Sequence, residues 1–125
     1  MKRKILLVED TPTILLMAKF RLEKADFEVI AAKNGEEALE LITQCRPDII
    51  LLDYGLPGMD GGEVCRRLKN DGRFSSIPVI IFTATIENLK LVKGLGVEDG
   101  ILKPYEPEDL IKKIEKCLKG TDDNK

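Results

Sequence analysis

The sequence predicts a doubly wound α/β fold, in which a five-stranded parallel sheet is covered by five helices. The first reason is that short runs of aliphatic residues alternate with segments whose apolar residues repeat at helical spacing. The second is that these runs are apolar throughout, which is typical of strands buried on both faces. Strict alternation of strands and helices favours parallel strands joined by crossover helices.

The expected elements follow one another without a linker, an internal repeat or a low-complexity segment. We expect strands at residues 4–8, 28–32, 47–53, 78–82 and 100–102. We expect helices that begin near Thr11, Asn34, Asp60, Ile86 and Pro107. The fourth helix should be short, because Gly94 weakens it and Gly96 stops it, and the last should close at Gly120.

Cap and turn residues place several helix boundaries. Asn34 with Glu37, and Asp60 with Glu63, have the three-residue spacing of a capping box. Pro47 should end the second helix, because the residue before a proline avoids helical backbone angles. These signals agree with the apolar periodicity and support the predicted order of elements.

A chain of 125 residues has the length of one domain with one core. We expect that domain over residues 1–119, followed by a polar tail at 120–125. The formal net charge of −2 gives no broad basic surface, so no direct binding of nucleic acid is expected. No apolar run approaches the ~20 residues of a membrane span, and the start lacks the apolar region of a signal peptide. We therefore expect a cytoplasmic protein without membrane insertion.

The residue types restrict the chemistry. The chain has no histidine, which excludes histidine acid–base catalysis, phosphohistidine and histidine-ligated metals. Its cysteines, Cys45, Cys65 and Cys117, lack metal-binding spacing and are expected to be reduced thiols with a packing role. A functional site must therefore be built from carboxylates, hydroxyls and lysines.

Polar side chains stand at the carboxyl ends of four predicted strands. Glu9 and Asp10 follow the first strand, Asp53 ends the third, Thr83 follows the fourth and Lys103 follows the fifth. Open α/β sheets bind ligands in the crevice outside the carboxyl ends of their strands. We therefore expect these five side chains to converge on one site.

Three clustered acids need a cation to be stable together. Two carboxylates about 4 Å apart repel by about 4 kcal/mol at an effective dielectric constant of 20. Oxygen ligands select a hard ion, so Mg²⁺ or Mn²⁺ is expected. A carboxylate beside such an ion and a lysine can be a nucleophile toward a phosphoryl group. Lys103 would neutralise phosphoryl oxygens, and the Thr83 hydroxyl would donate to one of them.

With these motifs, the sequence resembles the receiver domain of two-component response regulators from Lys2 to about Leu118. The resemblance rests on Leu7-Val8-Glu9-Asp10, Leu51-Leu52-Asp53, Leu56-Pro57-Gly58-Met59-Asp60-Gly61, Phe82-Thr83-Ala84 and Leu102-Lys103-Pro104. Each motif alone is weak, whereas the combination is highly specific. It implies that residues 1–119 form a receiver domain with a flavodoxin-like fold.

The resemblance also implies roles for the site residues. Asp53 would be the phosphoacceptor, and Glu9, Asp10 and Asp53 would hold the metal with the backbone carbonyl of Gly55. Thr83 and Lys103 would bind the phosphoryl group. The bond before Pro104 would be a cis peptide.

Our first hypothesis for the function is a stand-alone phosphorelay receiver, without an effector domain, that signals through phosphorylation-dependent binding. Its partners would be a sensor histidine kinase or phosphotransfer protein and an unidentified downstream protein. It would not be an enzyme, apart from the self-catalysed transfer onto Asp53 and the hydrolysis of the product.

Two features depart from the family pattern. Gly100 stands where the family usually has Tyr or Phe, three residues before the lysine. The stretch from Thr83 to Lys103 is also about two residues shorter than is common. In the family that aromatic ring swings inward on activation, so the output route of this chain must differ. Tyr105 is not obviously the same ring displaced.

Other interpretations stay open. The chain could be a degenerate receiver that binds partners independently of phosphorylation. It could also be a flavodoxin-like carrier or an aspartyl-phosphate phosphatase, although it has neither a phosphate-binding loop after the first strand nor a cap-sized insertion. Taken singly, Glu9 and Asp10 could be helix-start acids, Thr83 a strand-end hydroxyl and Lys103 a solvated lysine.

Overall fold

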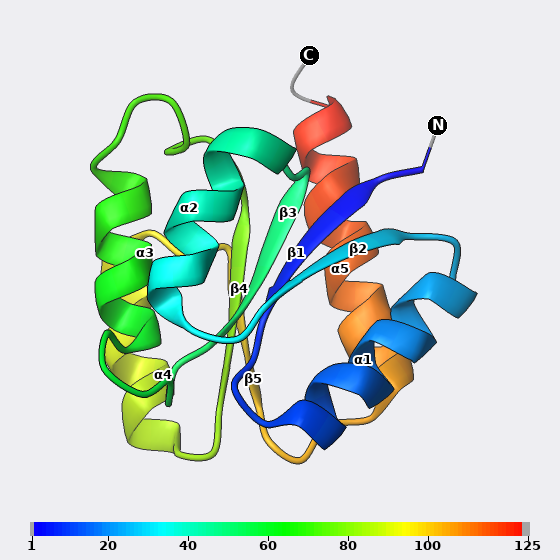
Figure 1. The fold of residues 1–125 in the computed structure, drawn as a ribbon, viewed down its shortest axis with the longest axis horizontal. Coiled ribbons are helices and arrows are strands. Elements are labelled where there is room, and N and C mark those ends of the chain that lie inside the picture. The colour runs from blue at the N-terminus through cyan, green and yellow to red at the C-terminus, as the bar shows by residue number, and fades with distance from the viewer. Residues whose placement is uncertain (1, 124–125) are drawn as a thin grey trace.

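The computed structural model describes residues 2–123, and they form a three-layered α/β structure (Figure 1). Its strands are β1 (Lys4–Val8), β2 (Glu28–Ala32), β3 (Ile49–Asp53), β4 (Val79–Thr83) and β5 (Asp99–Leu102). Its helices are α1 (Pro12–Lys24), α2 (Gly35–Cys45), α3 (Gly61–Lys69), α4 (Ile86–Val92), the 3₁₀ turn η1 (Lys93–Leu95) and α5 (Pro107–Asp123). The predicted doubly wound fold is confirmed.

All five strands are parallel and lie in the order β2-β1-β3-β4-β5. The chain runs outward from β1 to β2 and then returns to place β3 on the other side of β1. The strand order therefore reverses between β1 and β3, the position where sheets of this kind form a ligand crevice. The carboxyl ends of both strands meet there.

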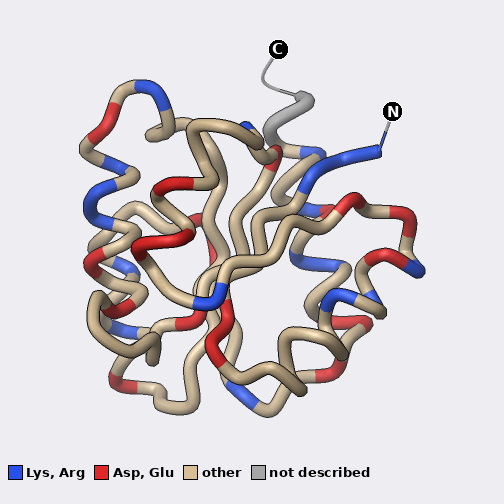
Figure 2. The backbone as a smooth tube through the Cα atoms, in the orientation of Figure 1, with Lys and Arg blue, Asp and Glu red and all other residues tan. Residues whose placement is uncertain are grey.

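The sheet is buried on both faces because helices cover both. One hydrophobic cluster packs α2, α3 and α4 against the sheet, and the other packs α1 and α5 against its opposite face. Every residue of β3 and β4 is buried, which explains why these strands are apolar up to their last residues, Asp53 and Thr83. Charged residues of both signs are intermixed along the surrounding helices (Figure 2).

The predicted capping residues act as expected. The Asn34 side chain accepts a hydrogen bond of 2.8 Å from the Glu37 amide, and the Asp60 side chain accepts one of 2.9 Å from the Glu63 amide. Both satisfy amides in the first helical turn, which have no partner inside the helix. These caps fix where the helices after β2 and β3 begin.

Two helix ends differ from the sequence-based expectation. The α-helical part of the fourth helix ends at Val92, and η1 continues it to Leu95 before Gly96 adopts a left-handed φ of +83°. Helix α5 continues past Gly120 to Asp123, because a glycine lowers helix propensity without forcing a stop. The last two residues of the expected polar tail, 124–125, lie outside the described residues.

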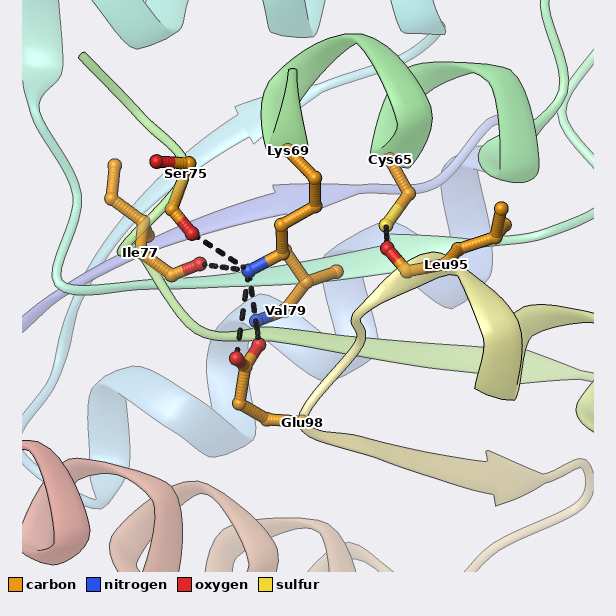
Figure 3. Close-up of polar contacts among 7 residues, drawn as sticks. All are labelled: Cys65, Lys69, Ser75, Ile77, Val79, Leu95 and Glu98. Atoms are coloured by element: carbon orange, nitrogen blue, oxygen red, sulfur yellow. Dashed lines mark hydrogen bonds and ion pairs between the residues drawn. The ribbon is translucent and has the colours of Figure 1, made fainter. Parts of the chain in front are cut away.

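A polar network ties α3 to the start of β4 and to the segment before β5 (Figure 3). Lys69 Nζ donates to the carbonyl oxygens of Ser75 and Ile77, at 3.2 and 3.0 Å, and lies 3.3 Å from Glu98 Oε1. The same Glu98 oxygen accepts a bond of 2.6 Å from the Val79 amide. The network therefore fixes the amino-terminal edge of the sheet, opposite the predicted site.

The predicted packing role agrees with the structure for Cys65 and Cys117, whereas Cys45 is only half-buried at the end of α2. Cys65 is fully buried in the α3 side of the core, and Cys117 packs against the cluster on the other face. Burial raises the pKa of all three thiols, which favours the neutral form. Within residues 2–123, no helix is both long and apolar enough to span a membrane.

Candidate functional site

The sheet places the predicted side chains at its carboxyl edge. Asp53 and Thr83 are the last residues of β3 and β4, while Glu9 and Lys103 directly follow β1 and β5. Main-chain bonds continue the sheet at this edge, because the Lys103 amide donates to the Thr83 carbonyl oxygen at 2.7 Å. The positions of these side chains therefore follow from strand register.

Lys103 joins two of the predicted acids. Its Nζ atom lies 3.3 Å from Asp53 Oδ1 and 3.4 Å from Glu9 Oε1. The Glu9 and Asp53 side chains are 1% and 7% exposed, and the lysine side chain is 25% exposed. The positive charge of the Lys103 ammonium group thus compensates the charges of two buried carboxylates that would otherwise repel each other. The same Nζ lies 5.0 Å from the centre of the Phe82 ring, in a cation–π contact.

Glu9 is held in place by the main chain. The Thr11 amide donates to Glu9 Oε2 at 3.1 Å, and the Glu9 amide itself donates to the Ala32 carbonyl oxygen. Burial raises the pKa of the Glu9 carboxyl, and the nearby Asp53 charge adds to this effect, whereas the Thr11 amide and Lys103 oppose it. Burial is the largest of these effects on the Glu9 pKa. A further cation beside Glu9 would lower that pKa and favour the ionised carboxylate.

Asp10 completes the acidic cluster from an exposed position. One carboxylate oxygen from each of Glu9, Asp10 and Asp53 lies within 4.8 Å of the others. Three oxygen donors at this spacing suit a hard divalent cation, so the cluster is compatible with Mg²⁺ binding. The Gly55 amide faces the cluster and donates to Asp53 Oδ1 at 3.2 Å, and the role of its carbonyl oxygen as a ligand stays a prediction.

Thr83 is buried, and its hydroxyl is bonded to the segment that follows β4. The hydroxyl oxygen accepts from the Thr85 amide at 3.4 Å and from Asn88 Nδ2 at 3.3 Å. The Thr85 side chain in turn caps α4 by accepting from the Asn88 amide at 3.2 Å. Asn88 was not among the predicted site residues, although its place three residues after Thr85 is typical of a capped first turn.

The aromatic side chains of Phe82 and Tyr105 lie beside the site, and neither was predicted to be part of it. The rings of Phe82 and Tyr105 pack edge to face, with centroids 6.1 Å apart. Burial raises the pKa of the Tyr105 hydroxyl, and the charges of Glu9 and Asp53 raise it further. Tyr105 follows the Lys103-Pro104 peptide bond, which is cis, as the resemblance implies.

The sequence and fold both match known proteins. The family model for the response regulator receiver domain matches residues 5–115. The chain is 34% identical over 125 residues to the DNA-binding response regulator MtrA of Mycolicibacterium smegmatis, across 98% of this chain and 54% of that protein. It is 39% identical over 121 residues to the phosphate regulon transcriptional regulatory protein PhoB of Pseudomonas aeruginosa, across 95% of this chain and 53% of the relative.

Solved structures give the same result. A CheY-like response regulator receiver domain protein from Methanospirillum hungatei superposes with a TM-score of 0.92 at 28% identity, over the full length of both chains. The chemotaxis response regulator CheY4 of Vibrio cholerae gives a TM-score of 0.87 at 28% identity, over 94% of this chain and 99% of the other.

The present chain spans about half the length of the curated relatives it matches. For that reason the expectation of a receiver that acts without an effector domain stays a prediction. The family itself is decided by the match over residues 5–115, by the fold and by acids at the carboxyl ends of β1 and β3. The chain belongs to the receiver domain family of two-component response regulators.

Proposed function

We propose that the protein accepts a phosphoryl group on Asp53 and thereby changes its binding to a downstream protein. The observation that carries this proposal is the buried Asp53 carboxylate at the end of the central strand, with the Lys103 ammonium 3.3 Å away. Receiver domains are generally signalling domains without enzymatic activity of their own. The complete set of site residues argues against a receiver that binds partners without accepting a phosphoryl group.

The acidic cluster is the place where a metal would bind. Glu9, Asp10 and Asp53 would hold Mg²⁺ or Mn²⁺, together with the carbonyl oxygen of Gly55. A bound ion of this kind supplies positive charge to phosphoryl oxygens. The hard oxygen donors of the cluster fit such an ion, and burial raises the pKa of the Glu9 carboxyl even though Lys103 lies beside it.

In the proposed step, a carboxylate oxygen of Asp53 attacks the phosphorus atom of the donor. A new bond forms between this oxygen and phosphorus, and the bond from phosphorus to the donor breaks, with its electron pair leaving on the donor. Lys103 lies beside the attacking carboxylate and would neutralise charge on the phosphoryl oxygens. The Thr83 hydroxyl would donate to one of them. Attack of water on the phosphorus would later break the bond between phosphorus and the Asp53 oxygen, release inorganic phosphate and restore the Asp53 carboxylate.

The donor and the output follow from the family. Receiver domains interact with histidine kinases or phosphotransfer proteins, so we infer that such a protein supplies the phosphoryl group. A small acyl phosphate can replace it in vitro, because the chemistry of the step lies in the receiver itself. The downstream protein would recognise the surface that changes when Asp53 is modified.

Intact mass spectrometry after incubation with an acyl phosphate and Mg²⁺ tests the proposal. The parent protein should gain one phosphoryl group, whereas Asp53→Asn should gain none, because an amide is a poor nucleophile. Asp60→Asn is the matched control, since Asp60 is an exposed acid near the site that serves as the N-cap of α3, and it should still react. Phosphorylation mapped to Asp60 or to any other acid would overturn the assignment.

A further inference from the structure

Leu89 occupies the space above Gly100. A Cβ atom on Gly100 would lie 2.6 Å from Leu89 Cδ2, closer than real carbon atoms approach, and 3.6 Å from the carbonyl oxygen of Ile81. Leu89 belongs to α4 and Gly100 to β5. The absence of a side chain at residue 100 therefore allows α4 to place its own side chain directly against β5.

The neighbouring residue on α4 contacts the site. Asn88 Nδ2 donates to the Thr83 hydroxyl oxygen at 3.3 Å, and the Thr85 amide donates to the same oxygen at 3.4 Å. A hydroxyl has two acceptor lone pairs and one hydrogen to donate. These two contacts use the acceptor side of Thr83 and leave its hydrogen for another acceptor, such as a phosphoryl oxygen.

The segment that follows α4, up to the start of β5, is bonded to α3 (Figure 3). Cys65 Sγ contacts the Leu95 carbonyl oxygen at 3.8 Å, and Lys69 Nζ contacts both carboxylate oxygens of Glu98. Val92, at the end of α4, is 1% exposed. With its carboxyl-terminal side held in this way, α4 would take up a displacement at Thr83 mainly in its first turn.

We propose that Asn88 is a positioning residue that couples Thr83 to α4, and that Leu89 carries the resulting displacement to β5 at Gly100. This rests on the proposed function, because the trigger is phosphorylation of Asp53. Donation by Thr83 to a phosphoryl oxygen reorients the hydroxyl and changes the strength of its bond with Asn88. Only an interaction that differs between two states can shift their equilibrium, and this bond is such an interaction.

Nuclear magnetic resonance can follow the two ends of this connection. In the parent protein, phosphorylation with an acyl phosphate and Mg²⁺ should shift the Gly100 amide and Leu89 methyl resonances. Asn88→Ala removes the donor, and Asn88→Leu removes it while keeping a similar volume. One neutral hydrogen bond corresponds to a change of about fivefold in an equilibrium constant, so both variants should show a clearly smaller shift at Gly100.

The Gly100 shifts of the parent protein and the variants are compared at equal phosphoryl occupancy, measured by intact mass. A variant that is merely phosphorylated more slowly then gives the same shift as the parent. Lys90→Gln is the matched control, because Lys90 is an exposed residue of the same helix, and it should respond like the parent. An undiminished Gly100 shift in both Asn88 variants, or an equal loss in Lys90→Gln, would refute the role of Asn88.

A second experiment tests the contact between Leu89 and Gly100 in the unphosphorylated protein. Gly100→Ala must displace the Leu89 side chain, so its effect on the free energy of unfolding should differ between the parent protein and the Leu89→Ala variant. Side chains in contact give such non-additive effects, whereas distant ones give additive effects. Additive effects would overturn the contact.

The two proposals fail in different ways. If the parent protein gains no phosphoryl group by mass, the proposed function is wrong, and the trigger assumed here is wrong with it. If the group is gained and the Gly100 resonance stays unchanged, the proposed function stands and the connection through Asn88 and Leu89 is refuted.

Discussion

At the scale of single residues, Gly61 decides how closely α3 can approach the end of β3. A Cβ atom on Gly61 would overlap the carbonyl oxygen of Asp53 and would lie 2.7 Å from Tyr54 Cα. Both are backbone atoms, which cannot rotate away as the end of a side chain can. The Gly61 amide also donates to the Tyr54 carbonyl oxygen at 2.9 Å. Glycine is therefore required here for close packing rather than for an unusual φ.

We predict that Gly61→Ala lowers the free energy of unfolding by about 2 kcal/mol or more, because the backbone beside Asp53 must shift. Gly72→Ala is the matched control, since a Cβ atom there meets nothing within 4 Å. It should leave stability unchanged or raise it by about 0.4–1 kcal/mol through the unfolded chain. Urea unfolding measures both, and equal midpoints for the two variants would contradict the close approach.

Lys103 has a structural role in addition to its proposed chemical one. It is the cation that the structure places against both buried carboxylates, Glu9 and Asp53. Removing one partner of a buried ion pair costs about 3–5 kcal/mol, and water reduces this where the partner is partly exposed. The lysine side chain is 25% exposed, so we expect a loss of stability below that range.

We therefore predict that Lys103→Ala lowers the free energy of unfolding by about 1–3 kcal/mol in metal-free buffer, and that Mg²⁺ restores part of the loss. Lys112→Ala, an exposed lysine of α5, is the control and should be close to neutral. Urea unfolding with and without Mg²⁺ provides the measurement. A Lys103 variant as stable as the control would show that the carboxylates need no cation.

At the scale of elements, the network around Glu98 joins α3, the start of β4 and the segment before β5. One oxygen of Glu98 accepts from the Val79 amide and also faces Lys69 Nζ. The first residue of β4 and the last turn of α3 thus share one carboxylate. The segment between η1 and β5 is held by this shared acceptor.

Glu98→Ala should lower the free energy of unfolding by about 1–3 kcal/mol, because the buried Val79 amide loses its acceptor. Amide hydrogen exchange should accelerate at Val79 and in residues 95–98. Glu115→Ala, which changes an exposed glutamate of α5, serves as the control for the loss of one negative charge. Unchanged exchange at Val79 would show that the network contributes nothing to local stability.

At the scale of the whole molecule, charge at one edge of the sheet is linked to global stability. Three carboxylates meet at the carboxyl ends of β1 and β3, and both strands belong to the fully buried centre of the fold. A cation that binds only the folded arrangement must stabilise the entire domain, because the unfolded chain does not hold the three acids together.

Mg²⁺ should therefore raise the melting temperature, with a stabilisation of about 2.7 kcal/mol at a concentration 100 times the Kd. Asp10→Asn should weaken this response, because it removes one carboxylate while leaving the buried pair with Lys103 intact. Thermal unfolding across a Mg²⁺ titration measures the effect, with Asp109→Asn on α5 as the control. A melting temperature that does not change in millimolar Mg²⁺ would rule out the metal site.

Local sequence was sufficient to determine the fold and the position of the site. The aliphatic runs before Glu9 and Asp53 specify strands buried on both faces, and alternation with helices specifies parallel pairing. Parallel strands bring their carboxyl ends to one edge, which is why Glu9, Asp53 and Lys103 could be predicted to meet. Asn34 and Asp60 identified helix starts because a cap acts on amides only three residues away.

Tertiary structure alone decided the contacts between residues that no short spacing relates. Leu89 against Gly100, Glu98 with Lys69, and Gly61 against Asp53 depend on how helices sit on the sheet. Sequence periodicity indicates which face of a helix is buried but not which atoms that face meets. In the sequence, Gly100 indicates a missing aromatic side chain. In the fold, the Leu89 side chain of α4 fills the space next to Gly100, because close packing requires that the space be filled and does not depend on which residue fills it.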